Sequence, residues 1–174
     1  MLDALAHVHA RATFFVVGKL ARAHPQLVRR AICEGHTIGN HTWSHRHPWT
    51  LTSEAGRREV LDGAAAVADI TGTQPAYFRP PHGRLNRCMM ETAMATGQSV
   101  LLWSLSVRDW GAFGRAGSIT ERLGRARSED IVLMHDGPMR INRPDQLLRA
   151  LPEFLYQNRD RWRYRELGTR PSVR

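Results

Sequence analysis

The 174-residue sequence has almost no lysine, few cysteines and no long apolar run. Lys19 is the only lysine, so the formal net charge of +9 comes almost entirely from arginines spread along the chain. Nucleic-acid binding favours a basic patch interleaved with aromatic residues, and only residues 159–165 approach that pattern. Because arginines alternate there with Trp162 and Tyr164, the pattern favours a half-buried strand over a nucleic-acid-binding stripe. We expect no specific nucleic-acid partner, although contact with an anionic polymer stays open.

The two cysteines and the short apolar runs exclude several classes of protein. Cys33 and Cys88 are too few for a disulfide framework, and neither lies in a metal-type Cys-x-x-Cys pair. No apolar run reaches membrane-spanning length, and the first residues lack the basic start and long apolar core of a signal peptide. Localisation and oligomeric state are left open. The composition, 42% hydrophobic and 24% charged, predicts one domain over residues 1–174.

Strand-like and helix-like segments alternate along the chain. Strands are expected at 12–18, 37–41, 75–78, 99–103, 130–134 and 162–167. Helices are expected at 1–10, 20–35, 52–72, 86–96, 118–126 and 145–158. Thr52 can cap its helix, and Pro152 should kink or break the last one. The alternation predicts an α/β domain with a mostly parallel sheet, with Trp103 in its core.

Unusual polar residues follow the C-terminal ends of four predicted strands. They are His41 and His45, then Arg79 and His82, then Asp109, and finally His135. In a barrel of parallel strands these ends meet at one rim, where the active site lies. Two histidines four apart on a helical turn share a face and can chelate one divalent ion, although hydrogen-bonded or solvated histidines show the same spacing. His36 is expected to enter its strand bonded to backbone.

These motifs resemble those of a known family, the polysaccharide deacetylases of carbohydrate esterase family 4. His41-Thr-Trp-Ser-His45, Arg79-Pro-Pro-His-Gly83, Asp109-Trp110 and Leu133-Met-His135 stand in the same order as four of the family's five motifs. The resemblance runs from Leu2 to Leu167 and implies an α/β fold, a deformed (β/α) barrel. It also implies metal-dependent removal of N-acetyl groups from a polysaccharide or oligosaccharide.

The resemblance assigns a role to each matching position. His41 and His45 would bind a divalent metal, most often zinc. Arg79 would orient the catalytic carboxylate, while Asp109 would hold and tune the His135 imidazole. His135 would be the general acid that protonates the departing amine, which suits an imidazole near neutral pH.

Substrate contacts are implied in the same way for three apolar residues. Trp110 and Leu133 would wall the pocket that receives the acetyl methyl group, with Pro80 as a further substrate-binding residue. Trp49 lies near the proposed rim and could stack on a sugar ring of an N-acetylated glycan, although tryptophan serves at least as often in simple packing.

One motif of the family is missing from this sequence. The family's first motif carries two neighbouring aspartates, one the general base and the other a metal ligand. The sequence contains no such pair, and two histidines are fewer than the three protein ligands usual in catalytic zinc sites. We therefore expect a catalytic domain that is N-terminally truncated and lacks its first strand. The alternative is a catalytically impaired relative that binds glycan or metal without turnover.

Overall fold

The computed structural model describes residues 1–137, 139 and 141–168. The chain forms two compact units. Ala12–Leu102 and Glu166–Arg174 make up the first, which we call the four-stranded unit. Met1–Arg11 and Trp103–Arg165 make up the second, which we call the two-stranded unit.

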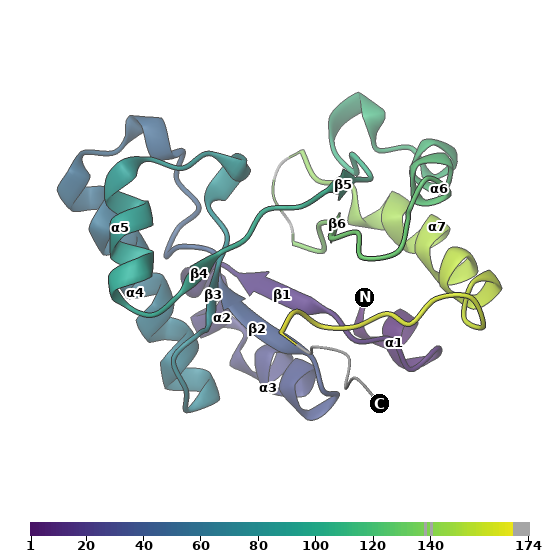
Figure 1. The fold of residues 1–174 in the computed structure, drawn as a ribbon, viewed down its shortest axis with the longest axis horizontal. Coiled ribbons are helices and arrows are strands. Elements are labelled where there is room, and N and C mark those ends of the chain that lie inside the picture. Colours follow the sequence, from purple (N-terminus) through teal and green to yellow (C-terminus); the bar gives the residue numbers. More distant parts are fainter. Residues whose placement is uncertain (138, 140, 169–174) are drawn as a thin grey trace. The chain divides into compact units, whose positions relative to one another are not determined.

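The four-stranded unit is built on one parallel sheet (Figure 1). Its strands pair in the order β1 (Thr13–Val16), β2 (Thr37–Asn40), β3 (Tyr77–Phe78) and β4 (Ser99–Val100). The helices are α2 (Gly18–Ala23), α3 (Pro25–Cys33), α4 (Ser53–Thr71) and α5 (Arg87–Ala95), with 3-10 turns η1 (Pro48–Thr50) and η2 (Pro81–Gly83). Strands and helices alternate along the chain, and the parallel sheet confirms the predicted fold class.

Helix α4 supplies much of the core of this unit. Val60 and Val67 lie on its buried face, and Val60 packs with Phe78 of β3 and Met89 of α5. The predicted N-cap is confirmed, because the Thr52 hydroxyl accepts a hydrogen bond from the Ala55 backbone at 3.2 Å. Burial of this apolar face holds α4 against the sheet, where it contacts β2. His41 and His45 follow the end of β2.

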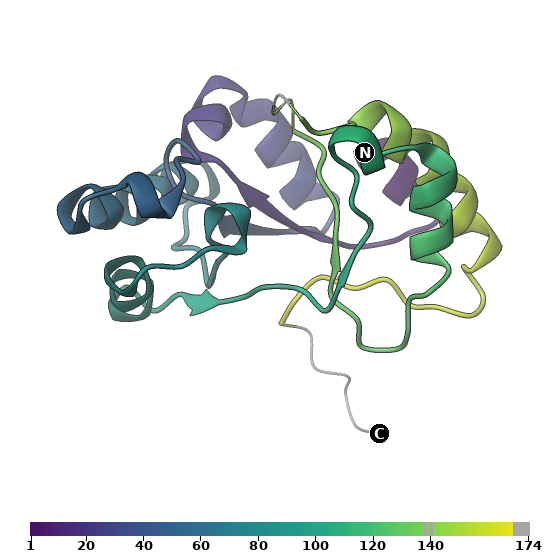
Figure 2. The ribbon, with the colours of Figure 1, turned by 90° about the horizontal axis from the view of Figure 1, so that it is seen from above.

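The two-stranded unit pairs β5 (Leu105–Ser106) with β6 (Val132–Leu133) in parallel. Its helices are α1 (Leu2–Ala6), α6 (Ala116–Leu123) and α7 (Pro144–Gln157), with a 3-10 turn η3 (Gly111–Phe113). Helices α6 and α7 lie side by side (Figures 1 and 2). Ile119 of α6 and Leu147 of α7 are completely buried. Pro152 neither breaks nor ends α7, which continues to Gln157.

Outside the candidate active site, three predictions about local structure are wrong. The helix expected over 20–35 is two helices, because Pro25 disfavours helical backbone at His24, where φ is −133°. Residues 162–167 form no strand; Arg11 N–H bonds to the Tyr164 carbonyl at 3.1 Å instead of continuing a ladder. Trp103 follows β4 and is only half-buried, so it is not a core residue.

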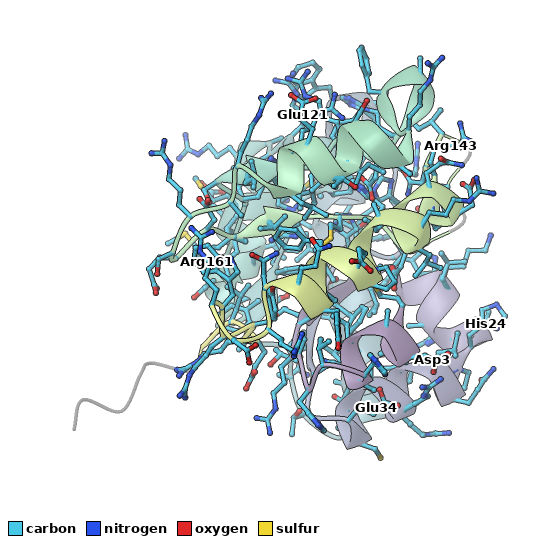
Figure 3. All side chains as sticks on the ribbon, turned by 90° about the vertical axis from the view of Figure 1, so that its right-hand side faces the viewer. Asp3, His24, Glu34, Glu121, Arg143 and Arg161 are labelled. Carbon is cyan, nitrogen blue, oxygen red and sulfur yellow. The ribbon has the colours of Figure 1, made fainter. Side chains whose placement is uncertain are left out.

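The surface of the described residues mixes both signs of charge. Glu121, Arg143 and Arg161 point outward at separate places on the two-stranded unit (Figure 3). Several exposed arginines pair with glutamates four residues away, as Arg58 does with Glu54 at 2.9 Å. Each helix in the described ranges is too short or too polar to cross a membrane.

Candidate active site

His41 follows the last residue of β2 and is held by its backbone and by its ring. Its N–H donates to the Val16 carbonyl at 2.9 Å. Its Nδ1 lies 2.6 Å from the Arg79 carbonyl oxygen, which can only accept, so Nδ1 carries the proton. The lone pair of the neutral ring is therefore on Nε2. A backbone carbonyl that fixes the tautomer in this way is a common partner of metal-binding histidines.

His45 reaches the same place through a loop and not through a helix. Thr42 and His45 have φ values of 67° and 59°, so the segment is not helical and the predicted helical turn is wrong. The two rings of His41 and His45 nevertheless contact each other with centroids 4.7 Å apart. A left-handed conformation is strained for a β-branched residue such as Thr42, and surrounding structure must hold it.

Asn40 supplies much of that support. Its side chain is fully buried, and its Oδ1 accepts the Thr42 backbone N–H at 3.0 Å. Its Nδ2 donates to the Val60 carbonyl and to Gln98 Oε1, both at 2.9 Å. In turn, the Thr42 hydroxyl accepts the His45 N–H at 3.1 Å. Asn40 thus connects the loop to α4 and to the start of β4.

Helix α4 approaches the loop closely at a glycine. A Cβ on Gly63 would lie 2.6 Å from the Thr42 carbonyl carbon and would overlap the Asn40 side chain. One turn earlier, buried Glu59 accepts the Ser44 N–H at 2.8 Å. Gly63 allows the loop between His41 and His45 to approach α4 closely, and Glu59 binds that loop through the Ser44 N–H. This role of Gly63 could not be predicted from the sequence, because the close approach is between segments distant in sequence.

His82 and His47 extend the row of histidines. The His82 ring contacts His45 at a centroid distance of 4.8 Å and stacks on His47 at 4.9 Å. His82 lies in η2 with φ of 57°, directly after two prolines that fix the preceding backbone. His82 was expected at the rim without a defined role, and His47 was assigned no function. The sequence signals differ for the two residues: the rigid Pro-Pro step precedes His82, and His47 lies two positions after His45.

Arg79 follows β3 and is 8% exposed. Its Nε and Nη2 donate to the Leu101 and Leu102 carbonyls at 3.3 and 2.8 Å, and its guanidinium lies 4.1 Å from the centre of the Phe15 ring. Burial lowers the pKa of the Arg79 guanidinium to about 10, so it keeps its positive charge at neutral pH. These hydrogen bonds connect the end of β3 to the segment after β4. That Arg79 orients a catalytic carboxylate stays a prediction.

Asp109 and His135 form a tightly bonded pair in the two-stranded unit. Asp109 is completely buried; one carboxylate oxygen accepts the His135 N–H at 2.6 Å, and the other lies 2.8 Å from His135 Nδ1. Because both oxygens accept, Nδ1 carries the proton and Nε2 is the nitrogen that can exchange one. The His135 side chain is 29% exposed. This arrangement is suited to general acid–base chemistry.

The three predicted substrate-binding residues have different environments. The Trp110 ring meets the His135 ring edge-on with centroids 5.5 Å apart. Leu133 lies in β6 and is 6% exposed. Pro80 is buried in the four-stranded unit, next to Arg79. The structure therefore brings Trp110 into contact with His135, and the substrate roles of all three residues stay predictions.

The donor set for a metal ion is incomplete among the described residues. His41 and His45 offer two imidazoles in contact, and His41 has the tautomer that a metal ligand needs. Within residues 1–137, 139 and 141–168, no group of three or more histidine, cysteine or carboxylate side chains is placed to hold a metal ion. The residues present suit zinc chemically, with fewer ligands than a usual catalytic zinc site has.

Comparisons with known sequences agree with the motifs. A family model for polysaccharide deacetylase matches residues 1–101. A peptidoglycan-N-acetylglucosamine deacetylase of Bacillus cereus is 36% identical over 157 residues, which cover 89% of this chain and 72% of that protein. A chitooligosaccharide deacetylase of Rhizobium leguminosarum bv. trifolii is 35% identical over 137 residues, which cover 79% of this chain and 64% of that protein. The chain thus spans part of each relative's length.

A solved structure shows the same fold. The peptidoglycan deacetylase PdaC from Bacillus subtilis superposes with a TM-score of 0.83 at 27% sequence identity. The match covers 96% of this chain and 79% of that chain. The α/β fold expected from the motifs is therefore confirmed.

Proposed function

Because this chain belongs to the polysaccharide deacetylase family, we propose that it hydrolyses the N-acetyl group of a glycan that contains N-acetylglucosamine. Both relatives described above act, by their names, on glycans of this chemistry, one on peptidoglycan and the other on chitooligosaccharides. The proposal takes residues 1–174 as one catalytic domain. It includes a divalent ion, most often zinc, as cofactor at His41 and His45.

The bonded pair of Asp109 and His135 is the observation that carries this proposal. In deacetylation, a water oxygen bonds to the acetyl carbon, the C–N bond breaks, and the amine nitrogen must take up a proton. Protonated His135 gives that proton from Nε2 and becomes neutral, and the proton that the attacking water loses passes to solvent. Asp109 holds the ring and offsets the positive charge of the protonated imidazole. The products are acetate and a free amino sugar.

The histidines of the four-stranded unit would hold the ion. His41 would offer Nε2, since its Nδ1–H is engaged by the Arg79 carbonyl, and His45 would offer the second imidazole. A divalent ion bound there would supply an activated water and stabilise negative charge on the carbonyl oxygen. Trp110 and Leu133 would contact the acetyl methyl group, with Pro80 as a further substrate contact.

A direct assay of acetate release tests this function. The zinc-loaded chain is incubated with peptidoglycan and with chitooligosaccharides, beside a His135→Ala variant. Acetate release by the parent chain that is lost in the variant is expected. If zinc- or cobalt-loaded protein released no acetate from either glycan, the proposal would be wrong.

The absence of a neighbouring aspartate pair favours a second candidate function. Without a carboxylate in the role of general base, the chain would bind glycan or metal with no turnover. Saturable binding of chitooligosaccharide with no acetate release would support this alternative. Catalytic release of acetate would exclude it.

A further inference from the structure

Trp49 is an exposed aromatic residue on a rigid turn. It lies in η1, and its side chain is 66% exposed. The Thr50 N–H and hydroxyl both donate to the His47 carbonyl, at 3.0 and 2.8 Å. Asn86, at the start of α5, donates to the carbonyl of buried Pro48 at 3.1 Å. The turn is therefore fixed from two segments, although it presents its largest side chain to solvent.

A row of ring contacts joins Trp49 to the histidines of the candidate active site. The Trp49 ring lies 5.2 Å from the His47 ring, which stacks on His82 at 4.9 Å. His82 in turn contacts His45 at 4.8 Å. All four residues belong to the four-stranded unit. Trp49 is thus three ring contacts from a candidate metal ligand, within the reach of a glycan of a few sugars.

The surroundings of Trp49 are polar and charged. The Arg84 guanidinium lies 4.9 Å from the centre of the Trp49 ring, and Arg84 is itself exposed. Arg46 and Thr50, which are near Trp49 in sequence, are also exposed. A protein-binding surface would present a contiguous apolar patch, and this single aromatic among polar side chains does not.

We propose that Trp49 and Arg84 form an accessory sugar subsite, which binds a pyranose ring of the glycan a few sugars away from the N-acetyl group at His41 and His45. The C–H face of a pyranose can pack on the indole, as apolar groups do on aromatic rings, and the guanidinium can donate to ring hydroxyls. The subsite rests on the proposed function and extends it, since it makes affinity depend on chain length.

Binding measurements on the intact chain test the subsite without any need for turnover. Trp49→Ala is compared with Met94→Ala, a control that removes another exposed apolar side chain, 65% exposed, from the same unit. Each protein is titrated calorimetrically with N-acetylglucosamine and with its β-1,4-linked tetramer. We expect the Trp49→Ala affinity for the tetramer to fall about tenfold, with the monosaccharide affinity unchanged. Met94→Ala should bind both like the parent chain.

The outcomes separate the subsite from the catalytic proposal. Wild-type tetramer affinity in Trp49→Ala, or no tetramer binding by the parent chain, would overturn the subsite. If the parent chain released no acetate but Trp49→Ala still weakened tetramer binding, the catalytic proposal would fail and the subsite would stand. Trp49→Phe keeps an aromatic face and should retain most of the affinity. This rescue excludes a general loss of structure as the cause.

Discussion

Two histidines of this chain are held at Nδ1 in the same way but by different partners. His41 in the four-stranded unit donates to a backbone carbonyl, that of Arg79, at 2.6 Å. His135 in the two-stranded unit donates to a buried carboxylate, that of Asp109, at 2.8 Å. A carbonyl accepts from Nδ1–H and so leaves the lone pair of the neutral ring on Nε2, the nitrogen that a metal ligand would use. A carboxylate also offsets the charge of a protonated ring, which suits a proton donor.

The two sites also differ in the number of contacts that hold their histidine rings in place. The loop with His41 and His45 depends on long-range contacts from α4 and on the buried Asn40 amide. The His135 ring depends on one carboxylate, that of Asp109, which accepts from the His135 Nδ1 and from the His135 backbone N–H. We therefore expect the first site to be sensitive to packing changes and the second to changes of a single charge.

The largest expected effects are on zinc binding and acetate release, and they should differ between the two histidine sites. A His41→Ala, His45→Ala double variant should lose zinc binding, while His135→Ala should bind zinc like the parent chain. Both should lose acetate release, with His135→Ala reduced by about 10²–10⁴-fold as is typical for loss of a general acid. Zinc content after dialysis and acetate assays measure the two effects. Equal zinc loss in both variants would remove the distinction between ligand and proton donor.

Removal of the charge at Asp109 is the next test. Asp109→Asn keeps the shape of the side chain but replaces one accepting oxygen with a donor, so it disfavours both the observed tautomer and the protonated ring. We expect kcat to fall by about 10²–10⁴-fold, with zinc affinity unchanged. Asp130→Asn is the control, since that exposed carboxylate bonds Ser104 in the same unit. An Asp109→Asn variant of normal kcat would show that the pair is only structural.

The sequence predicted elements best where their determinants are local. Thr52 and Gly72 delimit α4 by capping chemistry that acts within one turn, and both ends were predicted correctly. The break at Pro25 was also local and was missed, since the apolar spacing of Leu20, Leu27 and Val28 suggested one helix.

The candidate site was only partly predictable, for a physical reason. The residue types and their positions after strands identified His41, Asp109 and His135. The loop between His41 and His45 was predicted as a helical turn, but Thr42 is left-handed there. That conformation depends on Asn40, whose amide bonds Gln98, 58 positions away. A contact at such separation is set by tertiary packing, which local spacing does not encode.

Asn40→Ala tests how far the loop between His41 and His45 depends on that buried amide. The change leaves the Thr42 N–H and the Val60 carbonyl without their partner, so we expect a loss of roughly 3 kcal/mol in the free energy of unfolding. Zinc affinity should fall about tenfold, as for other residues that position metal ligands. Asn158→Ala removes a hydrogen bond at the end of α7 and should leave zinc affinity unchanged. Denaturant titration and zinc titration measure both effects.

The smallest effects come from a pair of helical glycines that should respond with opposite signs. Gly117 in α6 has open space where a Cβ would be, so Gly117→Ala should stabilise the chain by about 0.5–1 kcal/mol through helix propensity. Gly63→Ala gains the same propensity in α4, but its Cβ would meet the Thr42 backbone at 2.6 Å. Overpacking of this kind costs about 1–3 kcal/mol, so a net destabilisation with weaker zinc binding is expected. Stabilisation by both substitutions would show that α4 does not hold the loop between His41 and His45 in place.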